Sequence, residues 1–366
     1  MHLVSLHLED FRCFTGAVLD PDPEGTTVIT GRNGAGKTSL LEAVGYLATL
    51  QSFRGSPKEA MVRAGAERAI VRAETMVGER ALIIEAELST VGRTRTMVNR
   101  QVVRRRSDLH EALRATVFSP EDIAVVRGPP SDRRRFLDGI LAVIDQRSSS
   151  LSDDVDRILR QRAALLRQSN RRLSQEVAAT LDVWDSRLAA AGGALADARE
   201  ALTRRLQPLA TEHYARLAGE RGPVVLAYRR SWDGDLEQAL AASRTDDLRR
   251  GVTLVGPHRD DLELLLGGLP TRTHSSQGEQ RSVALALRLA AHQLATEHLG
   301  SAPVLLLDDV FSELDPFRSR ALLEGLPPGQ ALLTTALPPP PEVDAAKTFV
   351  VGDNGAVSPA AVHGAQ

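Results

Sequence analysis

Residues 28–39 read VITGRNGAGKTS, the pattern of a β-strand, a glycine-rich turn and the first turn of a helix. From Gly31 to Thr38 this stretch fits the phosphate-loop pattern G-x-x-x-x-G-K-[ST] at every fixed position. At average residue frequencies, a chance match in a chain of this length has odds on the order of 1 in 100. The chain holds only three lysines, which makes a chance lysine at position 37 rarer still. The stretch therefore predicts a nucleotide-binding α/β core.

The residue types of this loop suit a phosphate group. Glycines let the backbone wrap closely, so that successive N–H groups point inward and form a nest for an anion. The next helix then presents its unpaired N–H donors and the positive end of its dipole to the phosphate. Lys37 is predicted to reach the β- and γ-phosphates, and the Thr38 hydroxyl to ligate Mg²⁺. The residues expected to line the nucleotide are Gly31, Arg32, Asn33, Gly34, Ala35, Gly36, Lys37, Thr38 and Ser39.

Composition is that of an ordinary soluble globular protein, with 42% hydrophobic and 25% charged residues among 366. This length favours two domains, one of which can be built from distant segments. The formal net charge of −2 does not indicate a polyanion partner, so that case depends on local clusters. The single Cys13 excludes a disulfide framework or a multi-cysteine zinc site. Because neither a signal peptide nor a membrane-length apolar run is present, we expect a cytoplasmic protein.

A second acidic motif follows an apolar run in the last third of the chain. Val304–Leu307 has the length of a buried strand and leads into Asp308 and Asp309. In a parallel sheet, Asp308 would lie beside the phosphate loop and hold Mg²⁺, and Asp309 would polarise the attacking water. Two acids at a strand end are also common helix N-caps, so the motif alone leaves both interpretations open. Its combination with Lys37 and Thr38 favours a nucleotide site.

A loop rich in serine and glycine, SSQGEQR at residues 275–281, precedes a long amphipathic helix predicted to run to about His298. Because this loop opens a helix, it is a second anion site on the same principle as the first. Two phosphate-binding helix N-termini in one chain suggest that each grips a different ATP. That arrangement requires a dimer.

The middle of the chain carries patterns of antiparallel strands and then of a helical hairpin. Short alternating runs at 69–73 and 81–88 predict antiparallel strands. Apolar residues recur every seven positions along 151–165 and again along 181–202, which favours two antiparallel helices in a short coiled-coil arm. Pro208 is expected to kink or end the second helix.

Two arginine clusters are candidates for contact with DNA phosphates. The first comprises Arg93, Arg95, Arg100 and Arg104–Arg106, and the second Arg133–Arg135. A solvated face is the default interpretation of such runs, whereas arginine forks suit phosphate oxygens. The sequence leaves both interpretations open.

In combination these motifs resemble the ABC-type ATPases related to SMC proteins. The stretches that match their phosphate loop, signature, Walker B strand and D-loop are Gly31–Thr38, Ser276–Gln280, Leu307–Asp309 and Ser312–Asp315. The stretches that make the chain similar to the RecF family in particular are Leu6–Phe14, Phe118–Asp122, Arg133–Asp138 and Gly256–Asp261. The resemblance covers the chain nearly from end to end.

The resemblance implies an α/β fold with an ABC-type P-loop ATPase head. We expect the head to contain a mixed sheet with antiparallel strands and to comprise residues 1–130 and 251–366. A helical lobe with a short antiparallel coiled-coil arm is expected at residues 131–250. An arm of this length agrees with the brief heptad pattern.

The resemblance also implies an ATP- and Mg²⁺-dependent function in DNA replication, recombination and repair. RecF-like proteins dimerise with ATP, bind single-stranded and gapped or double-stranded DNA, hydrolyse ATP weakly, and cooperate with RecR-like and RecA-like proteins. By the motif match, Lys37, Asp308, Asp309 and Ser276 carry the chemistry, with Thr38 and Asp308 on the metal.

Further positions complete the site that the resemblance implies. Ser276, with Gln277 and Gly278, would reach the γ-phosphate bound by the other subunit, and Asp315 would lie at the subunit junction. Glu121 falls near the position of the Q-loop glutamine of relatives, which implies a sensing role.

Two positions depart from the pattern of many ABC proteins. Thr334-Thr335 stands where they carry a switch histidine, and Asp309 replaces the glutamate base usual in transporters. Both departures are typical of RecF-like proteins, but they leave the identity of the general base open. A shorter carboxylate needs a closer approach or a second water.

Two alternative functions are weighed against an ATP-dependent DNA clamp. The first is an SMC-like chromosome-organising ATPase, which is disfavoured because the heptads end within about a hundred residues. The second is a small-molecule kinase with a phosphate loop, which has no need of the signature stretch at 276–280.

Overall fold

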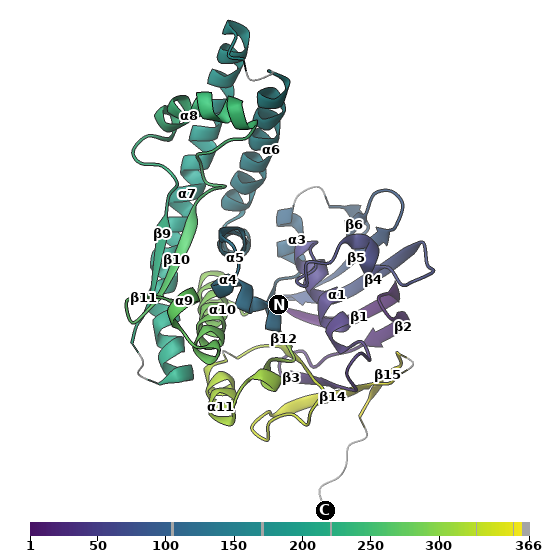
Figure 1. Ribbon diagram of the computed structural model, residues 1–366. Helices are drawn as coiled ribbons and strands as arrows, with labels where there is room; N and C mark the ends of the chain where they lie inside the picture. Colours follow the sequence, from purple (N-terminus) through teal and green to yellow (C-terminus); the bar gives the residue numbers. More distant parts are fainter. Residues whose placement is uncertain (104–105, 170–171, 220–221, 327, 354, 361–366) are drawn as a thin grey trace, which may run out of the picture. The chain divides into compact units, whose positions relative to one another are not determined.

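The computed structural model describes residues 1–103, 106–169, 172–219, 222–326, 328–353 and 355–360 (Figure 1). Its chain divides into two compact units. The first unit comprises Met1–Asp122, Arg216–Gly219 and Leu285–Gln366, and the second comprises Ile123–Ala215 and Glu220–Ala284. Each unit is described by itself below.

The first unit contains a six-stranded, mostly parallel sheet. Its strands are β3 (Thr26–Thr30), β8 (Ala115–Phe118), β12 (Val304–Asp308), β13 (Ala331–Thr335), β14 (Ala345–Val351) and β15 (Val357–Pro359). The strand order is β15-β14-β3-β13-β12-β8, and only the β14–β15 pair is antiparallel. Strands β12 and β13 are buried along their whole length, as the central strands of a parallel sheet are. The strand expected at 304–307 is thus confirmed.

The second sheet of this unit is entirely antiparallel. Its strands are β1 (His2–Phe11), β2 (Phe14–Leu19), β4 (Arg68–Val77), β5 (Arg80–Ser89), β6 (Arg95–Val98) and β7 (Gln101–Val102). They follow the order β2-β1-β4-β5-β6-β7. The alternating runs at 69–73 and 81–88 therefore form the antiparallel pair β4–β5, as predicted.

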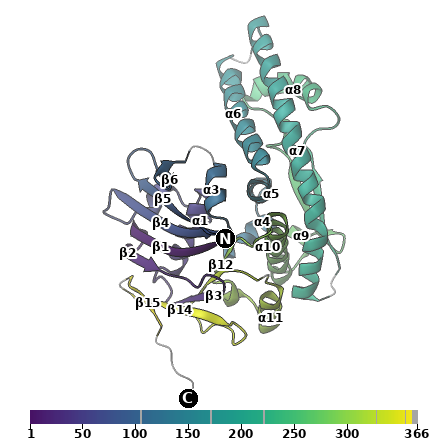
Figure 2. The same cartoon turned by 180° about the vertical axis from the view of Figure 1, so that it is seen from behind.

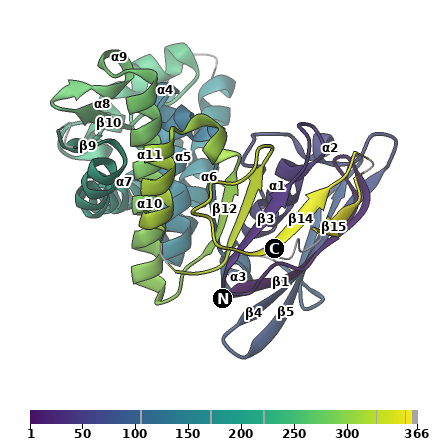
Figure 3. The ribbon, with the colours of Figure 1, turned by 90° about the horizontal axis from the view of Figure 1, so that it is seen from below.

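Helix α1 (Lys37–Thr49) lies between the two sheets (Figure 3). It contacts β12 and β13 on one side and β4 on the other, and every residue from Ser39 to Ala48 is buried. Both faces of this helix are buried because the antiparallel sheet, built from strands distant in sequence, covers the face opposite the parallel sheet. The smaller helices of this part of the chain are α2 (Lys58–Met61), α3 (Arg106–Ala112), the 3-10 turns at Pro120–Ile123 and Val310–Glu313, and α11 (Pro316–Gly325).

Helices dominate the second unit. They are α4 (Ala124–Arg127), α5 (Pro130–Ile144), α6 (Gln146–Gln168), α7 (Gln175–Ala218), α8 (Leu236–Arg250) and α9 (Thr271–His274), while α10 (Gln277–Leu299) has residues in both units. Across the described residues, no helix combines the length and the apolar character that a bilayer crossing needs.

A small antiparallel sheet lies in the same unit as these helices. Strand β10 (Asp261–Leu266) pairs with β9 (Val224–Arg229) over six residues and with β11 (Leu269–Pro270). This pairing keeps residues 251–284, expected in the head, in the same compact unit as the helices.

The two long helices α6 and α7 lie side by side as an antiparallel pair (Figure 2). Arg162 bonds to Asp185, and Leu166 packs in one apolar cluster with Leu181, so numbers rise along one helix as they fall along the other. The heptad leucines of α7 are buried, from Leu181 to Leu202. The predicted helical hairpin is therefore confirmed. The sequence also favours a turn at Ser169-Asn170, of which Asn170 lies outside the described residues.

Helix α7 does not end at Pro208, as one of the two expected outcomes required, because it continues through this proline to Ala218. A proline inside a helix costs about 3 kcal/mol, since it removes one hydrogen bond and crowds the preceding turn. Leu206, Ala210 and Tyr214 on either side of it are buried. Burial of a large apolar side chain contributes about 1.5–3 kcal/mol, so packing on both sides outweighs the local penalty.

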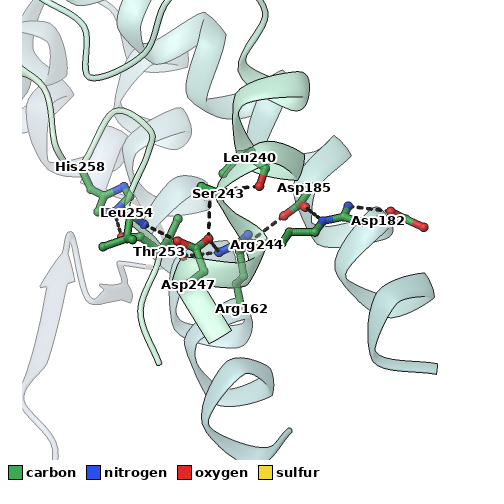
Figure 4. Close-up of polar contacts among 10 residues, drawn as sticks. All are labelled: Arg162, Asp182, Asp185, Leu240, Ser243, Arg244, Asp247, Thr253, Leu254 and His258. Carbon is green, nitrogen blue, oxygen red and sulfur yellow. Dashed lines mark hydrogen bonds and ion pairs between the residues drawn. The ribbon is translucent and has the colours of Figure 1, made fainter. Parts of the chain in front are cut away.

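A buried ion-pair network joins three helices of the second unit (Figure 4). Arg162 of α6 is fully buried, and its Nε donates to Asp185 Oδ1 of α7 at 2.7 Å. Its Nη1 donates to Asp247 Oδ2 of α8 at 2.7 Å and to the Thr253 hydroxyl at 2.9 Å. Arg244 of α8 donates to the second oxygen of Asp185. These bonds hold the arm to α8 and to the loop that follows it.

We expect Asp247→Asn to destabilise the second unit strongly, because the buried Arg162 charge would lose one of its two carboxylate partners and keep only Asp185. Loss of one member of a buried pair costs about 3–5 kcal/mol. The matched control is Asp246→Asn, since Asp246 is exposed and, among the described residues, pairs with Arg249 alone, one turn away; its cost should stay within about 0.5 kcal/mol. Urea unfolding followed by circular dichroism measures both, and equal midpoints would contradict a structural role for the network.

Candidate nucleotide-binding site

The phosphate loop folds as a tight glycine turn between β3 and α1. Gly31, Gly34 and Gly36 have φ of 149°, 84° and 113°, in the region that side chains rarely adopt. A Cβ on Gly31 would lie 2.5 Å from the Val351 carbonyl oxygen, and one on Gly36 would lie 2.6 Å from Cys13 Sγ. The glycines therefore satisfy both the backbone conformation and the close packing around the turn.

The N-terminus of α1 is free of any side-chain cap. Gly36 occupies the N-cap position in a left-handed conformation, without a side chain to bond the first N–H groups. In a phosphate-binding turn, these N–H groups donate hydrogen bonds to the anion. Within the predicted loop, Arg32, Asn33 and Gly34 are exposed, so a ligand can reach them from solvent.

Lys37 is buried beneath the loop, with its ammonium group held by the loop itself. Its Nζ donates to the carbonyl oxygens of Gly31 at 2.8 Å and Arg32 at 3.0 Å. Desolvation lowers the pKa of Lys37, and the nearby charges of Asp309 and Asp308 oppose that shift. The ammonium thus bonds to the glycine turn within the electrostatic range of the two acids, and its contact with a phosphate stays a prediction.

Asp308 ends strand β12 next to the phosphate loop. The Thr38 hydroxyl donates to its Oδ1 at 2.8 Å across a separation of 270 residues. Burial raises the pKa of the Asp308 carboxyl, and the charges of Glu121 and Asp309 act in the same direction, while the bonds from Thr334 and Thr38 oppose them. The influence of Glu121 brings the expected sensing residue into the electrostatic range of this carboxylate.

Asp309 begins a sharp turn directly after β12. Its backbone is left-handed, with φ of 47° and ψ of 29°. The Asp309 N–H donates to the Thr334 hydroxyl at 3.0 Å, and Oδ1 of its side chain is buried without a hydrogen-bond partner among the described residues. A buried acceptor of this kind calls for a polar partner.

The signature serine caps the helix that follows it. Ser276 and Glu279 form a capping box at the start of α10, in which the serine N–H and hydroxyl each donate to Glu279 Oε2 at 2.8 Å. Ser276 and Gln277 are exposed in the second unit. Their side chains are thus open to solvent, and a phosphate arriving at this helix end would compete with the Glu279 carboxylate.

Gln280 has a structural part in this loop that the sequence pattern does not reveal. Its buried side-chain amide donates to the carbonyl oxygens of Thr271, Arg272 and Ser275 at 3.0–3.1 Å. Arg127 donates to its Oε1. Gln280 thereby fixes the turn that presents Ser276.

Asp315 of the D-loop stretch is exposed and caps α11. Its Oδ1 accepts from the Arg318 N–H at 2.9 Å. This bond is the largest cause of its lowered pKa, and an ion pair with Arg318 adds to the effect. The residue keeps its charge at the surface of the first unit.

The two arginine clusters differ in how they are used. Arg133 is buried in a two-bond ion pair with Asp261, and Arg134 donates to the Asp260 carbonyl at 2.6 Å. These two side chains hold the first residue of β10 and the residue before it, so they are unsuited to the predicted phosphate contact. Exposed Arg135 pairs with Asp132 at 3.3 Å.

The cluster near β6 is more accessible. Arg93, Arg95 and Arg100 are exposed, and within the described part of the chain none of them forms an ion pair. Arg104 and Arg105, and the side chain of Arg106, lie outside what the structure describes. Three charged forks therefore remain available to an anion on this edge of the antiparallel sheet.

The Gly256–Asp261 loop is held from several sides within the second unit. Arg199 donates to the Pro257 carbonyl at 2.8 Å, and Tyr228 donates to Asp260 Oδ2 at 2.6 Å. His258 Nε2 lies 3.0 Å from the Thr253 carbonyl oxygen, which fixes that nitrogen as the donor. The motif is therefore part of the polar interior of this unit.

Comparison with known proteins places the chain among ATPases of DNA metabolism. The model of the RecF/RecN/SMC N-terminal domain matches residues 2–330. A DNA replication and repair protein RecF of Streptomyces avermitilis is 44% identical over 352 residues, which cover 92% of this chain and 93% of that one. A second, of Frankia alni, is 42% identical over 92% and 93% of the two chains.

Solved structures agree with the sequence comparison. The recombination mediator protein RecF–ATP of the RecFOR pathway superposes with a TM-score of 0.90 at 29% identity over 98% of each chain. An Smc head bound to the C-terminal winged-helix domain of ScpA has a TM-score of 0.59 at 16% identity, covering 99% of this chain and 98% of that one. The expected fold, an ABC-type ATPase head with a mixed sheet and long helices, is thereby confirmed.

The environment of His258 predicts a pH dependence of stability. Desolvation lowers its pKa to about 4, and the charges of Arg259, Arg134 and Arg162 add to this effect, while the bond to Thr253 opposes it. The unfolded histidine titrates near 6.5, so between these values the unfolded chain binds a proton that the folded chain does not. Stability from this group is full above about pH 6.5 and falls as the pH drops toward 4.

Replacement of His258 by Gln should therefore flatten the pH profile. We expect the urea midpoint of the wild type to fall more between pH 7 and pH 5 than that of His258→Gln. An equal fall in the two proteins would show that other groups carry the acid sensitivity.

Proposed function

The chain belongs to the RecF family, and we propose that it is an ATP-dependent DNA-binding protein of DNA replication and repair. The observation that carries this proposal is the junction of the phosphate loop with the acidic strand end, where Thr38 bonds to Asp308 at 2.8 Å beside Lys37. A glycine turn, a lysine and an aspartate in this arrangement are the parts that a triphosphate site of the P-loop class needs.

The residues present suit an ATP–Mg²⁺ complex. The Thr38 hydroxyl and the Asp308 carboxylate are hard oxygen ligands held within hydrogen-bond distance, and Mg²⁺ prefers such ligands. They would hold the ion, and the uncapped N-terminus of α1 and Lys37 would bind the phosphates. When bound, Mg²⁺ would neutralise charge on the β- and γ-phosphate oxygens.

Asp309 is our candidate for the group that activates the attacking water. Its buried Oδ1, which has no partner among the described residues, could accept a hydrogen bond from that water. Aspartate is one methylene shorter than glutamate, so its approach to the water is restricted. We therefore infer a weak ATPase, in which hydrolysis serves to release a bound state.

Dimerisation would complete the site. Ser276, Gln277 and Asp315 are exposed, and in such a dimer the helix end at Ser276 would accept a phosphate held by a second copy of the chain. ATP that bridges two heads would stabilise the dimer by mass action, without a need for fast turnover. We propose that this dimer clamps DNA at gaps.

The relatives support partners of the same pathway. Those from Streptomyces avermitilis and Frankia alni carry a role in DNA replication and repair in their names, and the solved relative belongs to the RecFOR pathway. We therefore propose cooperation with RecR-like and RecA-like proteins in the cytoplasm. An SMC-like chromosome organiser is less favoured, because α6 has only 23 residues.

Two variants should separate nucleotide binding from hydrolysis. Lys37→Met removes the positive charge that would contact the phosphates, so this variant should fail to bind ATP or to dimerise. Asp309→Asn should bind ATP and stay dimeric, with turnover reduced by about 10²–10⁴-fold if Asp309 is the base. Size-exclusion chromatography with ATP and an ATPase assay measure both properties. If the wild type and Asp309→Asn both stay monomeric with ATP, the result would instead favour a phosphate-loop kinase.

Substitution of the accessible arginines should weaken DNA binding in a salt-dependent way. In the triple variant with Gln at Arg93, Arg95 and Arg100, the magnitude of the negative slope of log K against log salt should decrease by about 0.9 for each lost phosphate contact. A control variant with Gln at Arg68 and Arg72, which pair with Glu87 and Glu85, should change little. Fluorescence anisotropy with ATP and duplex or gapped DNA tests this; an unchanged slope in the triple variant would refute these contacts.

A further inference from the structure

Thr334 lies directly opposite Asp308 in the parallel sheet. Strand β13, which ends at Thr335, runs between β3 and β12, and its register pairs Thr334 with Asp308 and Thr335 with Thr30. Thr334 is fully buried. Its position therefore places a hydroxyl group between the phosphate-loop strand and the acidic strand end.

The Thr334 hydroxyl bonds to both acidic residues at once. It donates to Asp308 Oδ1 at 2.7 Å and accepts from the Asp309 N–H at 3.0 Å. Because a hydroxyl has a single proton, the carboxylate takes that proton and the backbone N–H uses the oxygen lone pair. A hydrophobic side chain of the same shape would break both bonds.

The bond to Asp309 supports an unusual backbone conformation. Asp309 is left-handed at φ 47°, which is disfavoured for a residue with a side chain and persists only where its surroundings hold it. The Thr334 carbonyl accepts from the same N–H at 3.2 Å. Thr334 therefore stabilises the turn that orients the Asp309 carboxylate.

Asp308 has a second hydroxyl partner, Thr38, which the metal ion would also need. Asp308 Oδ1 accepts from two hydroxyls, those of Thr38 and Thr334. If Thr38 ligates Mg²⁺, its oxygen must face the ion, whereas Thr334 lies on the neighbouring strand and can keep its bond to the carboxylate. Groups that orient a metal-ligating carboxylate in this way tune its affinity for the metal.

We propose that Thr334 is a positioning residue that sets Asp308 for the metal and Asp309 for the attacking water. This inference rests on the proposed ATPase function. The occupant of the position where many ABC proteins carry a switch histidine would thus act through the two acids, without touching the nucleotide. Its neighbour Thr335 has another use, since its hydroxyl donates to the Leu337 carbonyl at 2.8 Å.

The test compares Thr334→Val, Thr334→Ser and the control Thr335→Val. Binding of a fluorescent ATP analogue is measured with EDTA and across a Mg²⁺ titration, together with kcat and KM for ATP. We expect Thr334→Val to match the wild type in EDTA, to need about 10–100-fold more Mg²⁺, and to lose kcat by a similar factor with little change in KM. Thr334→Ser keeps the hydroxyl and should restore both properties, and Thr335→Val should behave as the wild type.

Several results would overturn the inference. These are a wild-type Mg²⁺ requirement and kcat in Thr334→Val, a loss of equal size in Thr335→Val, or a failure of Thr334→Ser to restore them. Should Thr334→Val not fold in a thermal melt, Thr334→Ser decides: wild-type Mg²⁺ dependence supports the hydroxyl role, and its loss contradicts that role. If the wild type itself shows no binding of ATP with Mg²⁺, the proposed function fails instead.

Discussion

The hydrogen bond from Thr38 to Asp308 joins two segments separated by 270 residues, and the nucleotide site depends on that junction. In the proposed site neither segment is sufficient: the glycine turn would supply donors for phosphate, and the acidic strand end would supply oxygens for a metal. The parallel sheet brings them together because β13 fits between β3 and β12. The burial of α1 between two sheets then fixes the turn against the core.

Much of this architecture can be predicted from local pattern. The glycine spacing of 31–36 predicts the turn because few other residues tolerate a left-handed backbone. The apolar run at 304–307 predicts a central parallel strand because such a strand is buried on both faces. Strands β4 and β5 alternate with period two, and the leucines of α7 recur every seven residues. In each case the signal and the structure that it specifies lie in the same short segment.

The parts that could not be predicted depend on partners distant in sequence. The helix continues through Pro208, where residues on both sides are buried, and the Arg133 side chain forms an ion pair with Asp261, 128 residues away. The same holds for Thr334, whose two bonds arise only when β13 lies beside β12. A residue type shows which bonds a side chain can make, and the tertiary fold decides which bonds it does make.

The central claim is that Thr38 and Asp308 hold one metal ion against one triphosphate. Pulsed electron paramagnetic resonance with Mn²⁺ in place of Mg²⁺ and a non-hydrolysable ATP analogue tests it most directly. The account predicts ³¹P couplings from the bound nucleotide in the wild type, and weaker Mn²⁺ binding in both Thr38→Val and Asp308→Asn. Identical Mn²⁺ affinity and couplings in all three proteins would contradict it.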